Sequence, residues 1–349
     1  MKRAIVFLLA LALCLSAASV FAAPKPSIGC TIYKFDDTFM SYLRNQVQND
    51  AKGKIDISVQ DGQNDQPKEN DEIDQFISQG VTALAINMVD PSAVSVVIGK
   101  AKVKNLPLVL FNREPDAADM AKYAKAYYVG AKAQDSGTYE GQIMAKYWKA
   151  NPAADLNKDG VMDYVMLIGD PANTDAKFRT QYSIAAVEAA GIKTKLIASD
   201  TAMWDRPKAQ EKMAAWLTAY AGQIEVVFAN NDDMALGAIE ALKAAGYFKG
   251  GKYMPVVGVD ATPPALDALA QGTLLGTVKN DATGQGHAVF DLAYDLGNGK
   301  KPAASYSYPE TGTKLVLADQ DGKVNASGHY IWVPYTMVTK DNYKQFMAK

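Results

Sequence analysis

Short apolar runs alternate along most of the chain with longer stretches in which apolar residues recur every three or four positions. The run 28–33 is the first of these, and a short apolar run bounded by polar residues is typical of a buried strand. After it, Met40, Leu43 and Val47 fall on one face of a predicted helix, which Gly53 would end. One strand followed by one amphipathic helix is therefore the first unit of the chain.

The same unit repeats to about residue 130 and then begins again. The predicted strands are 28–33, 55–59, 83–86, 106–111 and 127–130, followed by 164–168, 195–198, 224–229, 256–259 and 275–278. Strands that alternate with helices across short connections predict parallel sheets with helices on both faces. We therefore expect an α/β protein made of two similar units.

The pattern changes after Gly299. The apolar runs 315–318 and 329–333 flank the turn pair Asp321-Gly322, which predicts a β-hairpin. A last helix is expected near the C-terminus.

The strand predicted at 224–229 ends in four consecutive polar residues: Asn230, Asn231, Asp232 and Asp233. We expect Asp233 to cap the helix that follows. Ligands of open α/β sheets bind just beyond the carboxyl ends of the strands, and amides and carboxylates can bond hydroxyl groups. A site for a neutral, hydroxyl-rich molecule is therefore predicted at this end of the strand.

Most other predicted strands also end in polar or aromatic residues: Asp37, Phe39, Asn87, Asn112, Trp204, Asp260 and Asn280. Asn and Asp also favour turns and helix caps, so none of these residues identifies a site by itself. Caps do not require Trp or Phe, however. The set as a whole therefore favours a ligand-binding edge.

The segment 155–163 has the spacing of a calcium-binding loop. It places Asp155, Asn157, Asp159, Gly160, Val161 and Asp163 at positions 1, 3, 5, 6, 7 and 9, where such a loop needs side-chain oxygens, a glycine turn and a backbone carbonyl. Position 12 is Met166 instead of Glu, and a strand follows. The loop would need a carboxylate from elsewhere, and an acidic solvated loop is the alternative. We expect a structural Ca²⁺, because a closed oxygen shell leaves no place for substrate.

The N-terminus has the pattern of a secretory signal peptide over residues 1–22. Basic residues precede an apolar run, and small residues come at its end; an uncleaved anchor is the alternative. Without Lys2 and Arg3 the 36 basic residues fall to 34 against 38 acidic ones, a net charge of −4. This charge argues against a nucleic-acid partner. Once Cys14 has left with the signal, Cys30 is alone and forms no internal disulfide. Cys30 fits the alternation of the strand 28–33, so we expect a buried core thiol, with a lipid-attachment site as the alternative.

The chain resembles the periplasmic galactose/glucose-binding proteins of ABC sugar importers. The resemblance is carried by the segments 32–37 (IYKFDD), 85–91 (AINMVDP), 155–160 (DLNKDG), 200–205 (DTAMWD) and 229–232 (ANND). It implies the type I periplasmic-binding-protein fold, two doubly wound parallel-sheet lobes joined by three crossing strands near Gly130, Asn280 and Tyr335. The first lobe would be 24–130 plus 281–334, and the second 131–280 plus 335–349.

The resemblance also implies the site residues. The sugar contacts would be Asp37, Phe39, Asn112, Asn173, Asp175, Arg179, Trp204, Asn231, Asp260 and Asn280, with Phe39 and Trp204 on the two flat faces of a pyranose. The chain departs from the family at Asn173, where the family usually has His. The calcium ligands would be Asp155, Asn157, Asp159, the Val161 carbonyl, Asp163 and Glu225. The family has Gln where Asp163 stands.

The function that the resemblance implies is a monomeric, non-enzymatic periplasmic receptor. It would capture D-galactose or D-glucose, deliver it to the membrane subunits of an ABC transporter, and present its closed form to a chemoreceptor. A sugar hydrolase is disfavoured, because His287 and His329 lie outside the predicted site and no nucleophile motif is present. A sugar-responsive repressor would need a DNA-binding segment where the signal peptide lies. A receptor for another pentose or hexose remains an alternative, because of Asn173.

Overall fold

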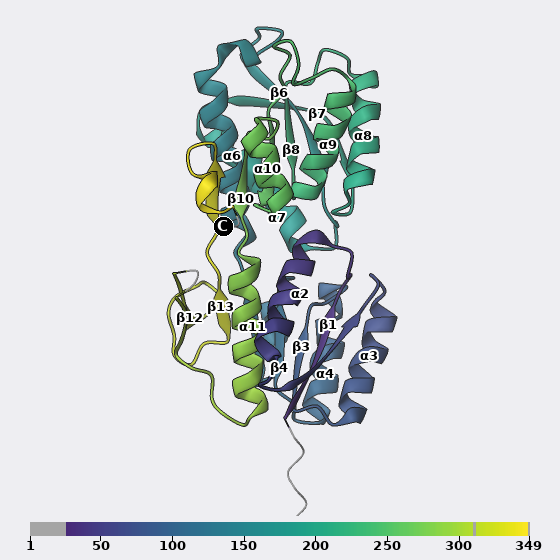
Figure 1. Cartoon of the computed structure of the whole chain (residues 1–349), viewed down its shortest axis with the longest axis vertical. Helices are drawn as coiled ribbons and strands as arrows, with labels where there is room; N and C mark the ends of the chain where they lie inside the picture. Colours follow the sequence, from purple (N-terminus) through teal and green to yellow (C-terminus); the bar gives the residue numbers. More distant parts are fainter. Residues whose placement is uncertain (1–25, 310–311, 348–349) are drawn as a thin grey trace, which may run out of the picture.

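The computed structural model describes residues 26–309 and 312–347, which form two α/β lobes stacked along the long axis of the molecule (Figure 1). The predicted signal peptide, 1–22, lies outside the described residues. The elements alternate as expected from the apolar pattern, and each lobe is built on a largely parallel sheet.

The sheet of the first lobe has eight strands in the order β11-β12-β13-β5-β4-β3-β1-β2. Their bounds are β1 (Ser27–Ile32), β2 (Asp56–Asp61), β3 (Ala83–Ile86), β4 (Leu108–Phe111), β5 (Ala126–Gly130), β11 (Ser305–Tyr308), β12 (Thr313–Ala318) and β13 (Tyr330–Trp332). The strands from β2 to β13 are parallel, and β12 and β11 add an antiparallel edge.

Helices cover both faces of this sheet. They are α2 (Thr38–Ala51), α3 (Gln66–Gln79), α4 (Val94–Val103), α5 (Ala117–Met120) and α11 (Ala282–Gly297), with a 3-10 turn η1 (Pro91–Ala93). Alternate strand residues face opposite cores: Ala85 packs with α2 and α11, whereas Leu84 and Ile86 pack with α3 and α4. Cys30 is buried in the first of these cores, and burial raises the pKa of its thiol to about 12. This burial confirms the prediction of a core thiol.

The sheet of the second lobe has six strands in the order β14-β10-β9-β8-β6-β7. They are β6 (Val161–Ile168), β7 (Lys193–Thr201), β8 (Val226–Ala229), β9 (Val256–Asp260), β10 (Gly276–Lys279) and β14 (Thr336–Thr339). The helices are α6 (Ala133–Ala150), α7 (Thr174–Ala189), α8 (Arg206–Ala219), α9 (Asp232–Ala244) and α10 (Pro263–Gln271), with 3-10 turns η2 (Pro152–Ala154) and η3 (Tyr343–Gln345). α6 and α7 pack on one face, and α8, α9 and α10 on the other.

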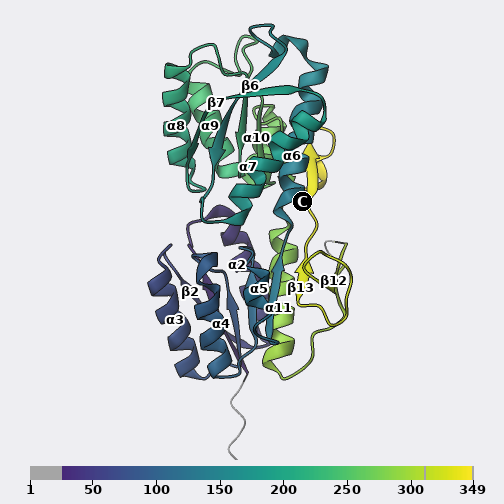
Figure 2. The same ribbon diagram turned by 180° about the vertical axis from the view of Figure 1, so that it is seen from behind.

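The chain crosses between the lobes three times. It leaves the first sheet after Gly130 to form α6, returns after Lys279 to form α11, and leaves again after Trp332 to form β14 (Figures 1 and 2). The second lobe therefore ends with a strand that comes from the far end of the sequence.

Two local predictions were wrong, and one was incomplete. The expected C-terminal helix is instead β14, which pairs antiparallel with β10 and buries Val338 against it, followed by one 3-10 turn. The predicted hairpin is confirmed, because β12 and β13 pair antiparallel, but the additional strand β11 was not predicted. α9 begins at Asp232 and is capped by Asn231, whose side chain accepts a hydrogen bond from the Met234 amide, so Asp233 is not the cap.

Candidate functional site

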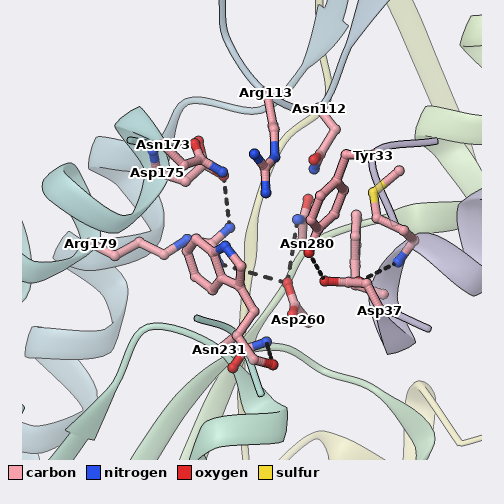
Figure 3. A pocket seen from close by; sticks show the side chains of 13 residues that line it. Tyr33, Asp37, Asn112, Arg113, Asn173, Asp175, Arg179, Asn231, Asp260 and Asn280 are labelled. Atoms are coloured by element: carbon pink, nitrogen blue, oxygen red, sulfur yellow. Dashed lines mark hydrogen bonds and ion pairs between the residues drawn. The ribbon is translucent and has the colours of Figure 1, made fainter. Parts of the chain in front are cut away.

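One cleft between the two lobes is lined by all ten residues predicted to contact a sugar. The empty space among its side chains, open solvent included, is about 330 Å³. Its lining is Tyr33, Asp37, Phe39, Met40, Asn112, Arg113, Asn173, Asp175, Arg179, Trp204, Asn231, Asp260 and Asn280 (Figure 3). The structure brings the predicted set together, and contact of each residue with a sugar remains a prediction.

The carboxyl ends of the strands supply most of these residues. In the first lobe, Asp37 follows β1 and Asn112 follows β4. In the second lobe, Trp204, Asn231 and Asn280 lie in the turns that follow β7, β8 and β10, and Asp260 is the last residue of β9. Parallel strands bring their carboxyl ends to one edge of a sheet, so residues far apart in sequence meet there.

Asp37 is fixed by two hydrogen bonds at the start of α2. Its Oδ1 accepts from the Met40 amide at 2.8 Å, and its Oδ2 accepts from the Tyr33 hydroxyl at 2.6 Å. Burial raises the pKa of this carboxyl. Phe39 lies in the first turn of α2.

The position of the Trp204 ring requires a glycine at position 169. A Cβ on Gly169, in the turn after β6, would collide with the Trp204 ring. The indole packs against the cores of both lobes. Gly169 therefore leaves the space that lets this ring form a wall of the cleft.

Three site residues have backbone conformations that favour glycine. The φ angles are +62° at Asn112, +64° at Trp204 and +128° at Asp260. Such conformations cost energy for residues with a side chain and are found preferentially at functional sites. Their gathering in one cleft supports a ligand-binding role for it.

Arg179 is the cationic centre of the second-lobe wall. Its Nη2 donates to Asp175 Oδ2 at 3.1 Å and to the Tyr335 hydroxyl at 3.2 Å, and its Nη1 donates to the Asn230 carbonyl at 2.8 Å. Asp260 lies 4.0 Å from Nη1. Burial raises the pKa of Asp175 and of Asp260, and the charge of Arg179 opposes both shifts.

Asn173 is the N-cap of α7. Its Oδ1 accepts a hydrogen bond of 2.9 Å from the Asp175 amide. One lone pair of the amide oxygen is therefore used within the protein, and the NH₂ group can donate to a ligand.

The four polar residues after β8 do not act together, contrary to the expectation. Only Asn231 lines the cleft. Asn230 accepts a hydrogen bond from the Gly169 amide, Asp232 is buried and bonds to two threonines, Thr262 and Thr277, and Asp233 pairs with an arginine of α8. Similarly, Asn87 bonds to the backbone of Tyr33 and Phe111 instead of facing the cleft. These four side chains bond within the protein, and none of them caps the helix that follows its strand.

The cleft also contains three residues that the sequence did not single out as contacts: Tyr33, Met40 and Arg113. Each is next to, or a few positions from, a predicted residue. Tyr33 follows β1, Met40 is beside Phe39, and Arg113 follows Asn112. A strand-end position was the available signal for Tyr33 and Arg113.

The predicted calcium loop lies at the opposite end of β6 from the cleft. Asp155 accepts hydrogen bonds from the amides of Asp159 and Gly160, and Asp159 accepts from that of Val161. Asn157 Oδ1 also accepts from the Asp159 amide. Such bonds wrap the loop into a tight turn.

Glu225 reaches this loop from the start of β8. Its carboxylate accepts from the Leu156 amide at 2.6 Å and from the Asp163 amide at 2.9 Å. The buried Oδ1 of Asp163 has no hydrogen-bond partner, and Lys195 Nζ lies 3.6 Å from it. In the described ranges, no group of three or more His, Cys, Asp and Glu side chains is arranged as a metal site. The carboxylates face backbone amides instead.

Comparison with known proteins agrees with this architecture. The model of the family described as "Periplasmic binding protein domain" matches residues 28–301. The chain is 44% identical to the D-galactose/methyl-galactoside binding periplasmic protein MglB of Haemophilus influenzae, over 99% of both chains. It is 35% identical to a putative rhizopine-binding protein of Rhizobium meliloti, over 86% of this chain and 94% of the relative.

A solved structure has the same arrangement of lobes. It is an ABC transporter solute binding protein from Bacillus halodurans with bound myo-inositol, with a TM-score of 0.76 and 26% identity, covering 94% of this chain and 99% of that one. No helix among residues 26–309 and 312–347 is long and apolar enough to span a membrane. From the family match, the close relative and the two-lobed fold, the chain belongs to the periplasmic binding protein family, with the type I fold.

Proposed function

We propose that this protein captures D-galactose or D-glucose in the cleft between its lobes and delivers the sugar to an ABC transporter. The observation that carries the proposal is the gathering of all ten predicted contact residues in one cleft. The relative that is 44% identical is named as a binding protein for D-galactose and methyl-galactoside, which supports galactose. The family consists of transport binding proteins and not of enzymes.

The chemistry of the cleft suits an uncharged sugar. Each sugar hydroxyl both donates and accepts hydrogen bonds, so it can pair with a carboxylate such as Asp37 and with an amide such as Asn280. Burial raises the pKa of three cleft carboxyls, Asp37, Asp175 and Asp260. Hydroxyl donors would satisfy these desolvated groups. The aromatic rings of Phe39 and Trp204 would cover the apolar faces of the pyranose.

The two histidines do not supply catalysis in the cleft. His287 Nδ1 lies 2.7 Å from Asp50, and His329 Nδ1 lies 2.7 Å from the Ala126 carbonyl. Neither residue lines the cleft. This placement supports capture of an unchanged ligand over hydrolysis.

A second candidate is a receptor for another pentose or hexose. Asn173 favours it, because Asn is shorter than the His that the family usually has at this position, lacks its imidazole, and already uses one lone pair of its oxygen to cap α7. Titration calorimetry with D-galactose, D-glucose, D-xylose and D-ribose separates the two candidates. Tighter binding of the first two sugars supports the proposal, and preference for a pentose would favour the second candidate.

We also propose a structural Ca²⁺ in the loop 155–163. Oxygen atoms of Asp155, Asn157, Asp159, Val161 (its carbonyl), Asp163 and Glu225 would hold it. The residues fit such an ion, because the buried Asp163 Oδ1 has no hydrogen-bond partner and the buried Glu225 lies beside the loop. Hard oxygen donors in a flexible loop suit Ca²⁺ better than Mg²⁺. The ion would neutralise the acidic loop and tie it to β8.

The proposed setting is the periplasm, after removal of the signal peptide 1–22. The partners in this proposal are the membrane subunits of the transporter and a chemoreceptor that recognises the closed form, with the protein acting as a monomer. The relative of Haemophilus influenzae is named a periplasmic protein, which supports the location. Size-exclusion chromatography with light scattering tests the monomer.

A further inference from the structure

The turn between β12 and β13 lies beside two of the segments that cross between the lobes. Gly130 and Trp332, after which the chain passes to the second lobe, are neighbours in the paired strands β5 and β13. Figure 2 shows the β12–β13 hairpin next to these crossings. The residues 319–323, which form the hairpin turn, do not line the cleft between the lobes. Any role of the hairpin turn in ligand capture would therefore act through the crossings.

The hairpin turn is held in shape by its own hydrogen bonds. The Asp319 carbonyl accepts a hydrogen bond from the Gly322 amide at 3.0 Å, and Oδ1 of Asp319 accepts from the Lys323 amide at 2.9 Å. The Asp319 amide donates to the Lys323 carbonyl at 3.0 Å. Bonds that close a turn on itself fix the directions of its other backbone groups. The carbonyl of Asp321 therefore points in a fixed direction.

Lys132 connects the hairpin turn to the first crossing. It is the N-cap residue of α6, and its carbonyl accepts a hydrogen bond from the Asp135 amide at 2.9 Å, so its backbone belongs to the second lobe. Its Nζ donates to the Asp321 carbonyl of the first lobe. A Cβ at Gly322 would lie 2.8 Å from this Nζ, so the glycine leaves room for the ammonium group. The bond joins the two lobes and depends on how they are turned relative to one another.

Trp332 connects the same turn to the third crossing. It is the last residue of β13, and its Nε1 donates to the Asp319 carbonyl at 3.0 Å. The ammonium group of Lys132 lies 5.4 Å from the centroid of the Trp332 ring, which is within the range of a cation–π interaction. The hairpin turn therefore contacts a residue beside each of two neighbouring crossings.

These contacts are present while the lobes lie close together. Nη1 of Arg113 in the first lobe is 3.2 Å from Oδ2 of Asp170 in the second lobe, across the cleft. Gln320 of the hairpin turn also lines a groove with Gln134 and Phe178 of the second lobe. Periplasmic binding proteins close around their ligands by hinge motion. The bonds of the hairpin turn therefore belong to the closed arrangement.

We propose that the hairpin turn is a brace for the hinge, in which Lys132 is a positioning residue that stabilises the closed arrangement. Lys132 touches no ligand, and the bond from its Nζ to Asp321 is broken when the lobes turn apart. A contact made in the closed arrangement alone raises the affinity for every ligand that requires closure by the same factor. The inference rests on the proposed function in one respect, because it assumes that a sugar is captured by closure, whichever sugar that is.

Titration calorimetry with D-galactose, D-glucose, D-xylose and D-ribose compares the wild type with Lys132→Met. The variant is expected to bind each sugar that the wild type binds about 3- to 10-fold more weakly, because a charged donor and a cation–π contact are lost from the closed arrangement. The factor should be the same for every sugar, since Lys132 touches none of them. Lys132→Arg keeps a charged donor and should bind more tightly than the methionine variant.

Two further variants sharpen the test. Trp332→Phe keeps an aromatic ring but removes the Nε1 donor, so it should weaken all sugars by a smaller common factor, and it serves if Lys132→Met does not fold. The matched control is Lys125→Met. Lys125 also donates to a backbone carbonyl, that of Asn105 at 3.1 Å, but both residues belong to the first lobe. This control should leave all affinities unchanged.

The outcomes separate the brace from the proposed function. A common loss of affinity in Lys132→Met, absent from Lys125→Met, supports the brace. Unchanged or tighter binding by Lys132→Met, with or without a lower Tm, would overturn it, and so would factors that differ between sugars. A wild type that prefers xylose or ribose would overturn the proposed sugar and leave the brace tested on the preferred one. No binding of any of the four sugars would overturn both.

Discussion

Arg179 donates a hydrogen bond of 3.1 Å to the carboxylate of Asp175, one turn earlier on α7, and both side chains are at most 8% exposed. Each partner of the pair can still form a hydrogen bond with a ligand. Arg179 Nε is buried without a hydrogen-bond partner, and the Asp175 carboxylate can accept several bonds. Buried, oriented polar groups of this kind bind a ligand without first having to be ordered. The second-lobe wall is therefore arranged before a sugar arrives.

Trp204→Ala should weaken binding of galactose by at least about 1 kcal/mol, or more than fivefold, because a ring that covers the ligand is lost. Titration calorimetry measures the change. Trp148→Ala is the matched control, since Trp148 packs on α6 away from the cleft. Unchanged affinity in the Trp204 variant would remove the stacking argument.

Gly169→Ala should weaken sugar binding through the same ring. The added Cβ collides with Trp204, so the indole must move from the cleft wall. Gly99→Ala is the control, because nothing lies within 4 Å of a Cβ at that position in α4. The control should bind normally and gain roughly 1 kcal/mol of stability from helix propensity. Equal affinities of the two variants would contradict the prediction.

Glu140 should make the protein less stable as the pH rises. It is fully buried in α6, and burial raises the pKa of its carboxyl well above the ordinary value, with the charge of Arg179 opposing the shift only in part. Above about pH 4.3, the ordinary pKa of Glu, the unfolded chain releases this proton while the folded protein keeps it. The free energy of unfolding therefore falls with increasing pH until the raised pKa is reached.

Glu140→Gln removes this contribution. Thermal melts should give the variant a higher Tm than the wild type at pH 8, with the difference shrinking toward pH 4. Glu240→Gln, at an exposed position of α9, is the control and should follow the wild-type curve. A wild type and a Glu140 variant with parallel pH profiles would show that Glu140 is ionised in the folded protein.

Chelation of calcium should lower the Tm, because the proposed ion binds the folded loop and not the unfolded chain. The shift should be smaller in Asp163→Gln, which removes one negative charge from the ligand set. Asp71→Asn, an exposed change in α3, is the control. Melting curves with and without a chelator provide the measurement, and an unchanged wild-type Tm would contradict the calcium proposal.

The apolar periodicity was sufficient to predict the two α/β units, because buried strands and amphipathic helices have different periods. The same periodicity was insufficient to predict short strands in which polar and apolar residues are mixed. β14 is only four residues long, and it becomes a strand because β10 offers an open edge for its backbone. Pairing of this kind depends on residues about sixty positions apart, which local pattern does not report.

Two signals in the sequence predicted site residues: their position at strand ends and the resemblance to a known family. Asn231 and Asp260 were found because they end strands, but Asn230 and Asp232 have the same local signal and turn into the protein. Their different roles come from neighbours such as Gly169 and Thr277, which only the tertiary structure supplies. Arg113 went unassigned for the same reason, because its partner Asp170 comes from the other lobe.

A crystal structure of the protein grown with D-galactose tests the central claim most directly. The account predicts one sugar in the cleft between the lobes, with its faces against Phe39 and Trp204. Its hydroxyls should lie within hydrogen-bond distance of Asp175, Arg179 and Asp260. A sugar bound elsewhere, or an empty cleft at saturating galactose, would contradict it.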